Sequence, residues 1–90
     1  MTEPHQWSLI IVSRAERELK GLPPRDQARI RTVVDRLAVD PRRGDVTKLH
    51  GLDDELRLRV GVWRVRFRLD RPSRTLVVLS VRHRREAYRA

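Results

Sequence analysis

Apolar residues recur at helical spacing twice in the first half of the chain. The first stripe is Ala15, Leu19 and Leu22, and the second is Ile30, Val33, Val34 and Leu37. The second set occupies the i, i+3, i+4 and i+7 positions that line one face of an amphipathic helix. Gly21 and the Pro23-Pro24 pair lie between the stripes, where they end one helix and begin the next. We therefore predict an antiparallel helical hairpin whose two stripes pack on a common sheet.

A short strand is predicted before the first helix. Residues 7–12 are apolar except for Ser8, include β-branched residues, and are followed by Ser13. The segment Ser13-Arg-Ala-Glu16 matches a capping box, in which the Ser side chain accepts from a free helical N–H and the Glu side chain reaches back to the cap. We therefore expect Ser13 to cap the first helix.

The hydrophobic period changes in the second half of the chain. Asp40-Pro-Arg-Arg-Gly-Asp45 ends the second helix, and the region up to Asp54 is predicted to be a loop. Strict alternation follows, with one set apolar and the other set arginine. The apolar set is Leu56, Leu58, Val60, Trp63, Val65, Phe67 and Leu69, and the arginine set is Arg57, Arg59, Arg64, Arg66 and Arg68. With a tight turn at Gly61-Val62, this pattern predicts a β-hairpin with an apolar face and an arginine face.

The last predicted strand differs from the hairpin, because residues 75–81 are apolar at both odd and even positions. Such a run is typical of a central strand covered on both sides. A turn at 70–74 precedes it, and residues 82–90 form a basic tail. The expected order is β-α-α-β-β-β. This predicts one α+β domain over residues 1–90, with two helices after a first strand packed on a small, mostly antiparallel sheet.

Composition excludes several classes of protein. The 90 residues contain no cysteine, which rules out disulfide scaffolds and thiol catalysis and favours a reducing cytoplasm. No apolar run approaches the roughly 20 residues of a membrane span, and the N-terminal residues do not resemble a signal peptide. We expect a cytoplasmic protein with no membrane partner.

The charge is concentrated in the second half. The chain has 21 Lys and Arg against 12 Asp and Glu, and all nine excess positive charges fall within residues 57–90. Like charges directly opposite on a sheet destabilise it, so the arginine face is expected to hold an anion. A solvated outer face is the alternative. Nucleic acid is the favoured polyanion. Base reading by ring stacking is not expected, because Trp63 and Phe67 belong to the apolar face and only Tyr88 lies in the basic tail.

The chemistry available to such a face is limited. The histidines, His5, His50 and His83, show no metal-ligand spacing, so no metal or other cofactor is expected. In RNA, the 2′-OH can attack its adjacent phosphate while cations stabilise the phosphorane. Arginines suit the cationic role but keep their protons. His83 and Tyr88 are the residues most able to move protons.

Four segments in order resemble the RelE/ParE superfamily of toxins of toxin–antitoxin systems. They are Ala15-x-x-x-Leu19-x-x-Leu22, Lys48-Leu49-x-Gly51, residues 56–65 of the hairpin, and Val81-Arg-His-Arg84-Arg-Glu-Ala-Tyr88. The resemblance covers almost the whole chain and implies a compact sheet with two N-terminal helices. Members similar to RelE cut mRNA in the ribosomal A site without metal.

The resemblance also implies functional residues. Arg64 would clamp the scissile phosphate, Arg84 would stabilise the phosphorane or leaving oxygen, and Tyr88 would orient a nucleotide. Well-studied relatives have lysines at the positions of Arg57 and Arg59, so the proton acceptor is open here, and His83 or the substrate itself is expected to supply it. The remaining expected RNA contacts are Lys48, Arg57, Arg59, Arg66, Arg68, Arg82 and Arg85.

Two alternatives and a partner accompany this expectation. ParE-like members resemble the same fold but block DNA gyrase and cut no RNA, and they tend to lack the tail Arg and Tyr that this chain has. A non-enzymatic nucleic-acid-binding module is the other alternative. Both toxin functions, mRNA cutting and gyrase inhibition, imply a cognate antitoxin with an acidic toxin-binding segment. They also imply that the chain contacts operator DNA only through the antitoxin complex.

Overall fold

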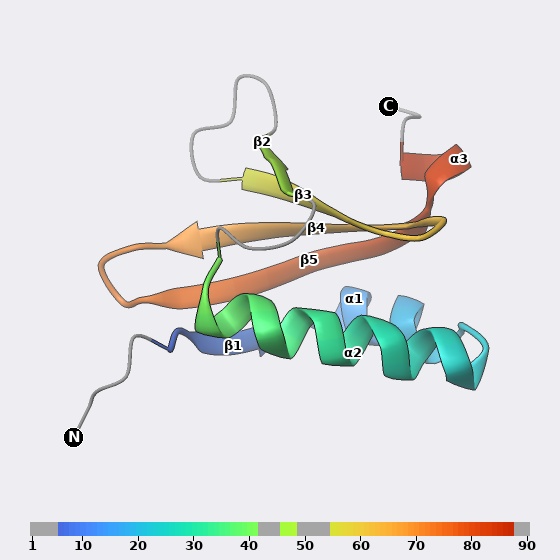
Figure 1. Cartoon of the computed structure of the whole chain (residues 1–90), viewed down its shortest axis with the longest axis horizontal. Helices are drawn as coiled ribbons and strands as arrows, with labels where there is room; N and C mark the ends of the chain where they lie inside the picture. The colour runs from blue at the N-terminus through green and yellow to red at the C-terminus, as the bar shows by residue number, and fades with distance from the viewer. Residues whose placement is uncertain (1–5, 42–45, 49–54, 88–90) are drawn as a thin grey trace.

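The computed structural model describes residues 6–41, 46–48 and 55–87 (Figure 1). Its elements are β1 (Ser8–Ile11), α1 (Ser13–Lys20), α2 (Pro24–Val39), β2 (Val46–Lys48), β3 (Glu55–Val60), β4 (Trp63–Asp70), β5 (Thr75–His83) and α3 (Arg84–Ala87). The predicted α+β class and the order of its six elements are confirmed. The structure adds the short strand β2 and the single helical turn α3.

The strands form one mixed sheet in the order β1-β5-β4-β3-β2. The β1–β5 pair is parallel and the other three pairs are antiparallel, so the expected mostly antiparallel sheet is confirmed. Figure 1 shows α2 running along the strands on one side of the molecule, with α3 next to the β3–β4 turn. The helical hairpin covers one face of the sheet and leaves the hairpin arginines on the other face.

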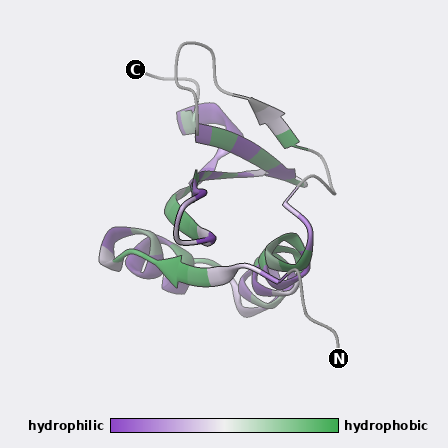
Figure 2. Cartoon of the chain, turned by 90° about the vertical axis from the view of Figure 1, so that its left-hand side faces the viewer, coloured by the Kyte–Doolittle hydropathy of each residue, from purple (hydrophilic) through white to green (hydrophobic). Residues whose placement is uncertain are grey.

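The core lies between that helix-covered face and the two helical stripes. Green and purple segments alternate along the strands in Figure 2, as expected where one face is buried and one is polar. The core residues with less than 2% exposure and the largest side chains are Phe67, Leu19, Ile30, Leu58, Leu76, Val65 and Val78. Both predicted stripes therefore reach the core, although Leu22 and Val33 are only partly buried at its margin.

The apolar run of β5 has two causes rather than one. Val77 is buried on the outer face opposite Arg68, so this part of the strand is covered on both sides as predicted. In addition, the pairing with β4 shifts between Arg66 and Phe67, which leaves Leu79 without a direct partner. Such a bulge reverses which positions face inward. For this reason both Val78 and Val81 are buried, although they are an odd number of positions apart along the strand.

The predicted capping box is wrong. The α1 helix begins at Ser13, its N-cap is Val12, and no side chain caps it. Glu16 instead accepts a hydrogen bond from Arg31 Nη2 of α2 at 2.7 Å and lies 3.8 Å from Lys20 Nζ. A charged partner on the neighbouring helix outcompetes a return to the helix start, because charge-assisted hydrogen bonds are the stronger ones.

The Glu16–Arg31 contact makes folding stability depend on pH. The Arg31 hydrogen bond, outweighing desolvation, holds the pKa of the Glu16 carboxyl below its ordinary value. A pKa lowered by folding stabilises the protein above the unfolded-state value and loses that effect as pH falls through the folded value. We expect Glu16→Gln to lower Tm at neutral pH, with the difference shrinking between about pH 5 and about pH 3. A difference that stayed constant would contradict this linkage.

Two other sequence expectations are corrected. The region before Asp54 is not all loop, because Val46–Lys48 pairs with Leu56–Leu58 as β2. Three residues on a sheet edge are too short to show alternation. The basic segment after Val81 is also not a plain tail, since β5 continues to His83 and α3 follows it. Residues 88–90 lie outside the described residues.

Two glycines provide a matched test of the hairpin turn. Gly61 has a φ of +60°, which strains any residue with a Cβ, and an added Cβ would lie 3.0 Å from Arg29 Nη1. Gly21, at the end of α1, has an ordinary φ of −79°. We expect Gly61→Ala to lower the free energy of unfolding by about 1–2 kcal/mol. Gly21→Ala should leave it equal or raise it by up to about 1 kcal/mol. Denaturant unfolding of both variants measures the contrast, and equal effects would contradict it.

Candidate nucleic-acid interface

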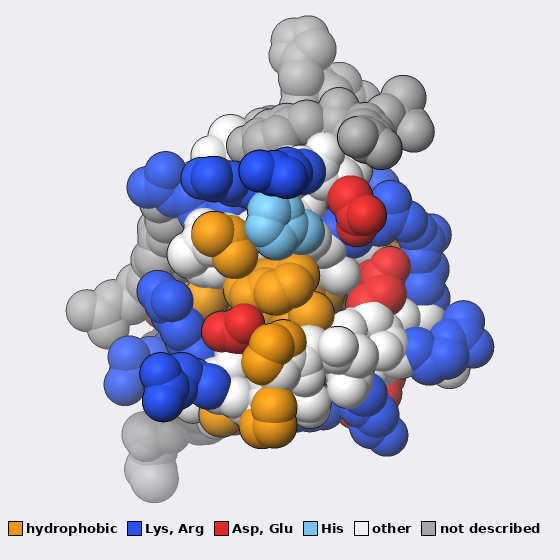
Figure 3. Space-filling view, turned by 90° about the vertical axis from the view of Figure 1, so that its right-hand side faces the viewer, with side chains coloured by type: hydrophobic (Ala, Val, Ile, Leu, Met, Phe, Trp, Pro, Cys, Tyr) orange, Lys and Arg blue, Asp and Glu red, His pale blue; other side chains and the backbone are white. Residues whose placement is uncertain are grey.

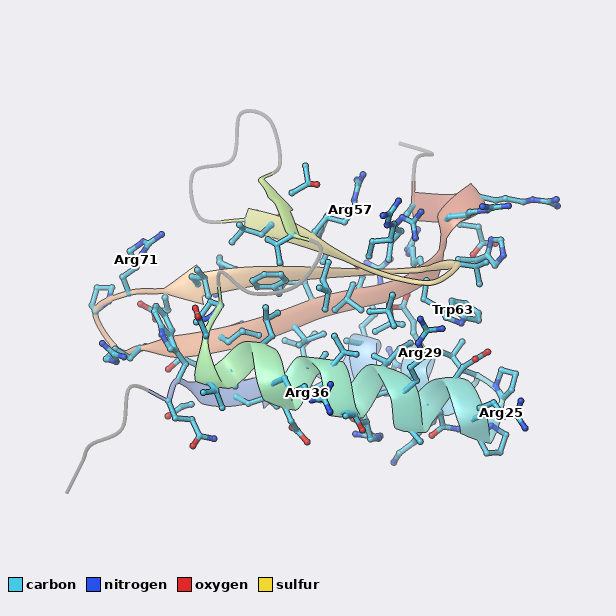
Figure 4. The ribbon with its side chains drawn as sticks, viewed as in Figure 1. Arg25, Arg29, Arg36, Arg57, Trp63 and Arg71 are labelled. Atoms are coloured by element: carbon cyan, nitrogen blue, oxygen red, sulfur yellow. The ribbon has the colours of Figure 1, made fainter. Side chains whose placement is uncertain are left out.

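Two pairs of arginines stand directly opposite each other on β3 and β4. Arg57 is the cross-strand partner of Arg66, and Arg59 is the partner of Arg64. Cross-strand partners lie on the same face, so all four belong to the face away from α1 and α2. Figure 4 shows Arg57 directed away from α2, whereas Trp63 lies on the side of α2. We call these residues, Arg57, Arg59, Arg64 and Arg66, the arginine face.

The arginine face has an acidic neighbour on one side and a further arginine on the other. Away from the β3–β4 turn, Arg68 is opposite Glu55, and the Glu55 carboxylate lies 3.5 Å from Arg66 Nε. The Glu55 carboxylate therefore adds a negative charge beside Arg66 and Arg68 at this end of the hairpin. Towards β5, Arg64 is opposite Arg82. The cationic row Arg59, Arg64 and Arg82 thus crosses three strands next to the turn.

Arg64 is held in place by backbone carbonyls. Its Nη1 donates to the carbonyl oxygens of Gly61 at 2.8 Å and Trp63 at 3.0 Å. A guanidinium held through Nη1 still offers the Nε and Nη2 hydrogens, which form one edge suited to two oxygens of a phosphate. The sheet position and these two bonds together give the Arg64 group a defined orientation before any ligand arrives.

The start of α3 is anchored to the same turn. The Arg84 N–H donates to the Val62 carbonyl at 2.7 Å. This bond brings Arg84 and Arg85, both exposed, to the end of the sheet where the Arg59–Arg64 pair lies. Residues that are 20 or more positions apart in the sequence are thereby gathered at one end of the molecule.

His83 lies on the other side of the sheet from the arginine face. Its cross-strand partner is Trp63, and the two rings meet edge-on with centroids 5.5 Å apart. The His83 Nδ1 accepts a hydrogen bond from the Arg85 N–H at 3.2 Å. In the neutral ring this places the proton on Nε2. The structure therefore does not bring His83 together with Arg57 and Arg59, and it ties the ring to the first turn of α3.

A pocket of about 490 Å³ opens beside His83 at this end of the molecule. It is lined by Glu18, Leu22, Trp63, Val81, Arg82, His83 and Glu86. Figure 3 shows this end, with the histidine between a row of Lys and Arg side chains and an apolar surface. The pocket wall is therefore mixed, with charged side chains beside apolar ones.

Two contributors at this end were missed in the sequence. Glu18 accepts a hydrogen bond from the Val81 N–H at 2.8 Å and pairs with Arg82. Arg29 of α2 reaches the β3–β4 turn at Gly61, and Figure 4 shows it near Trp63. Both come from the half of the chain whose charges cancel, so net charge gave no signal. The three-residue spacing from Ala15 to Glu18 does place Glu18 beside the apolar stripe, which is a weak signal of proximity to the sheet.

Several expected features lie partly or wholly outside what is described. Lys48 is in β2, but its side chain is not described, and Tyr88 follows the last described residue. Among the described residues, no group of three or more His, Asp or Glu side chains is arranged to hold a metal ion. Within those same ranges, no helix has the length and apolar content needed to span a membrane.

Comparison with known proteins adds a family and a fold. A family model described as the ParE toxin of type II toxin–antitoxin systems matches residues 9–88. A protein of Methanocaldococcus jannaschii that carries the toxin name RelE1 is 25% identical over 87 residues, covering 93% of this chain and 97% of that protein.

Solved structures of toxin–antitoxin complexes contain chains with a similar fold. A chain of the Mycobacterium tuberculosis toxin–antitoxin complex RelBE2 superposes with a TM-score of 0.76 at 29% identity, covering 87% of this chain and 98% of that chain. A chain of the RelE–RelB complex of Pyrococcus horikoshii superposes with a TM-score of 0.78 at 26% identity, covering 94% and 99%. The fold seen in the present structure is thus that of these toxin–antitoxin proteins.

Proposed function

This chain belongs to the RelE/ParE superfamily of toxins of type II toxin–antitoxin systems, and we propose that it is an endoribonuclease that cuts mRNA on the ribosome. The arginine face carries the proposal. Arg57 is directly opposite Arg66 and Arg59 is directly opposite Arg64, so four guanidinium groups are concentrated on one face of two paired strands, an arrangement that a bound anion would stabilise. The backbone of an RNA strand would supply such anions, because it carries one phosphate at each nucleotide.

The proposed reaction is an internal phosphoryl transfer. The 2′-oxygen attacks the adjacent phosphorus, a bond from O2′ to phosphorus forms, and the bond from phosphorus to O5′ breaks. The proton of the 2′-OH passes to a non-bridging phosphate oxygen and then to the departing O5′, so the substrate itself carries it. Guanidinium groups keep their protons at neutral pH, and they lower the barrier by stabilising the charge on the phosphorane.

The arginines at the β3–β4 turn have separate roles in this proposal. Arg64, oriented by the Gly61 and Trp63 carbonyls, binds the scissile phosphate through Nε and Nη2. Arg84, anchored at Val62, stabilises the developing charge on the phosphorane and on O5′. Arg57, Arg59 and Arg66 bind flanking phosphates, together with Lys48, Arg68, Arg82 and Arg85.

His83 and Tyr88 are given supporting roles. Because the His83 Nδ1 already accepts from Arg85, protonating that nitrogen would break the bond that holds the start of α3. His83 is therefore proposed to fix α3 rather than to receive the 2′-OH proton. Tyr88 follows α3 by one residue and is proposed to orient the nucleotide next to the cut.

An antitoxin is the proposed protein partner. The relatives from M. tuberculosis and P. horikoshii were solved as complexes of toxin and antitoxin. An acidic segment suits a chain with a net charge of +9. Binding of such a segment over the arginine face would exclude mRNA, and any contact with operator DNA would be made through the antitoxin.

Addition of the purified chain to a reconstituted translation system tests the proposal. Primer extension on a single mRNA should show cuts that require ribosomes and disappear when the antitoxin is present in excess. Intact mRNA with ribosomes would overturn the proposed activity.

A second candidate is inhibition of DNA gyrase, favoured by the ParE description of the matching family model. It predicts loss of gyrase supercoiling at chain concentrations that leave mRNA intact. The arginine face would then bind gyrase or its DNA, and Arg84→Ala would change binding rather than cutting. Running the supercoiling assay on the same preparation separates the two candidates.

A further inference from the structure

The outer edge of β5 is covered by two different elements. From Thr75 to Val78 the strand pairs with β1, and the last contact of that edge is the Val12 N–H bonded to the Val78 carbonyl at 3.1 Å. The chain then turns into α1, so β5 continues for five residues beyond its parallel partner. An unpaired backbone N–H on this part of the edge needs another acceptor.

Glu18 of α1 supplies that acceptor. Its Oε1 accepts from the Val81 N–H at 2.8 Å. Its Oε2 lies 3.5 Å from Arg82 Nε and 3.4 Å from Arg14 Nε. The Glu18 side chain is 24% exposed, whereas Val81 is buried. The Glu18 carboxylate therefore supplies the hydrogen-bond acceptor that a neighbouring strand would otherwise provide. The same carboxylate also pairs with the side chain of Arg82, the next residue along β5.

We propose that Glu18 is a positioning residue for the RNA-cutting site, an inference that rests on the proposed function. The peptide group it holds immediately precedes Arg82 and His83, and α3 with Arg84 begins directly after them. The start of α3 is also held by the Arg84 N–H bond to the Val62 carbonyl and by the Arg85 N–H bond to His83 Nδ1. Glu18 thus sets where β5 ends, and through it the place of Arg84.

The backbone bond is the part of this contact that matters most. Arg82 and Arg14 are half-exposed partners at 3.4–3.5 Å, and exposed ion pairs of this kind contribute little. The bond to Val81 is shorter, partly buried and made to an ionised acceptor, which is the stronger arrangement. An amide oxygen of similar shape can accept the same bond without the charge.

A three-variant experiment follows from that difference. Glu18→Gln keeps the acceptor for Val81, and Glu18→Ala removes it. Glu16→Ala is the control, because it removes a carboxylate of the same helix whose ion-pair partners, Lys20 and Arg31, lie in α1 and α2. Single-turnover cutting of ribosome-bound mRNA gives the rate and the half-saturating concentration. Amide exchange at Val81, followed by NMR on each purified variant, reports the contact without any cutting.

We expect Glu18→Ala to lower the cutting rate by roughly 10- to 100-fold, as misplacement of a catalytic group does, with little change in half-saturation. Its Val81 amide should exchange faster than in the unaltered chain. Glu18→Gln should restore slow exchange and a rate within about 3-fold of the unaltered chain. Glu16→Ala should lower Tm and leave the rate unchanged.

The outcomes separate this inference from the proposed function. Equal rates for the unaltered chain and Glu18→Ala would overturn the positioning role while leaving the endoribonuclease in place. Equal losses in Glu18→Ala and Glu16→Ala would also overturn it, because they would reflect stability alone. Intact mRNA with the unaltered chain would overturn the proposed function, and the positioning role with it.

Discussion

Replacement of Arg84 by alanine is expected to reduce cutting of ribosome-bound mRNA by about 10²- to 10³-fold. Removal of one charge-stabilising donor from a phosphoryl or acyl transfer site typically has this effect. Arg84 is exposed and the bond that anchors α3 uses its backbone N–H, so the fold should be unchanged by the substitution. The loss should fall on the rate of the cutting step and only weakly on binding. Primer extension under single-turnover conditions measures it.

Arg71→Ala is the matched control for Arg84→Ala. Arg71 is also an exposed arginine, but it lies in the β4–β5 turn, and Figure 4 shows it at the far end of the molecule from Trp63. The substitution removes the same charge without touching the proposed site. We expect cutting by Arg71→Ala to stay within about 2-fold of the unaltered chain, since distant surface charges are screened by salt. Equal losses in both variants would mean that net charge, and not Arg84, determines the rate.

Replacement of Phe67 by alanine is expected to lower the free energy of unfolding by about 3–5 kcal/mol. Phe67 has 0% exposure and lies on β4, the central strand, in the core cluster that also contains Leu19 of α1 and Ile30 of α2. A domain of this size has a total stability of about 5–13 kcal/mol. The variant should therefore be close to unfolding at 37 °C. Urea unfolding followed by circular dichroism measures the change.

Phe67→Leu provides the comparison for Phe67→Ala. Leucine keeps most of the buried apolar volume, so the expected loss is smaller, about 1–2 kcal/mol. A loss of less than about 1 kcal/mol for Phe67→Ala would contradict the placement of this ring at the centre of the core.

The hairpin could be predicted almost residue by residue from its alternation. Leu58, Val65 and Phe67 are buried as expected, and Arg57 and Arg59 are opposed by arginines across the ladder. Alternation of this kind fixes the faces of a strand, because a slip of one residue would expose every apolar side chain. The helical hairpin could be predicted equally well from the sequence, because the proline pair marks its turn and the apolar stripes mark its buried side.

The end of β5 could not be predicted in the same way. An apolar run carries no alternation, so the bulge opposite Arg66 and Phe67 left no mark in the sequence. Because residues 82–90 were predicted to be a tail, no face of the sheet could be assigned to Arg82 or His83. In the structure the strand continues, and its alternation places Arg82 on the outer face and His83 on the face of Trp63.

The contacts of Glu18 depend on tertiary structure in a similar way. Glu18 can accept from the Val81 N–H because β1 pairs with β5 only as far as Val78 and stops short of the end of β5. The relative lengths of these two paired strands are a property of the folded structure. The capping-box pattern drew attention to Glu16 instead, and that residue pairs with the neighbouring helix. Local patterns identify which segments form helices and strands, but not which charged side chain the fold brings to an open strand edge.

Blocking the 2′-oxygen of the mRNA tests whether this oxygen attacks the phosphate. An mRNA is prepared in two forms, unmodified and with a single 2′-O-methyl group on the nucleotide that is cut, and both are presented on ribosomes. We expect cutting of the unmodified mRNA, with a cyclic or terminal phosphate on the upstream fragment, and no cutting at the methylated nucleotide. Cutting that persists at the methylated nucleotide would contradict attack by the 2′-oxygen, and intact unmodified mRNA would contradict the endoribonuclease itself.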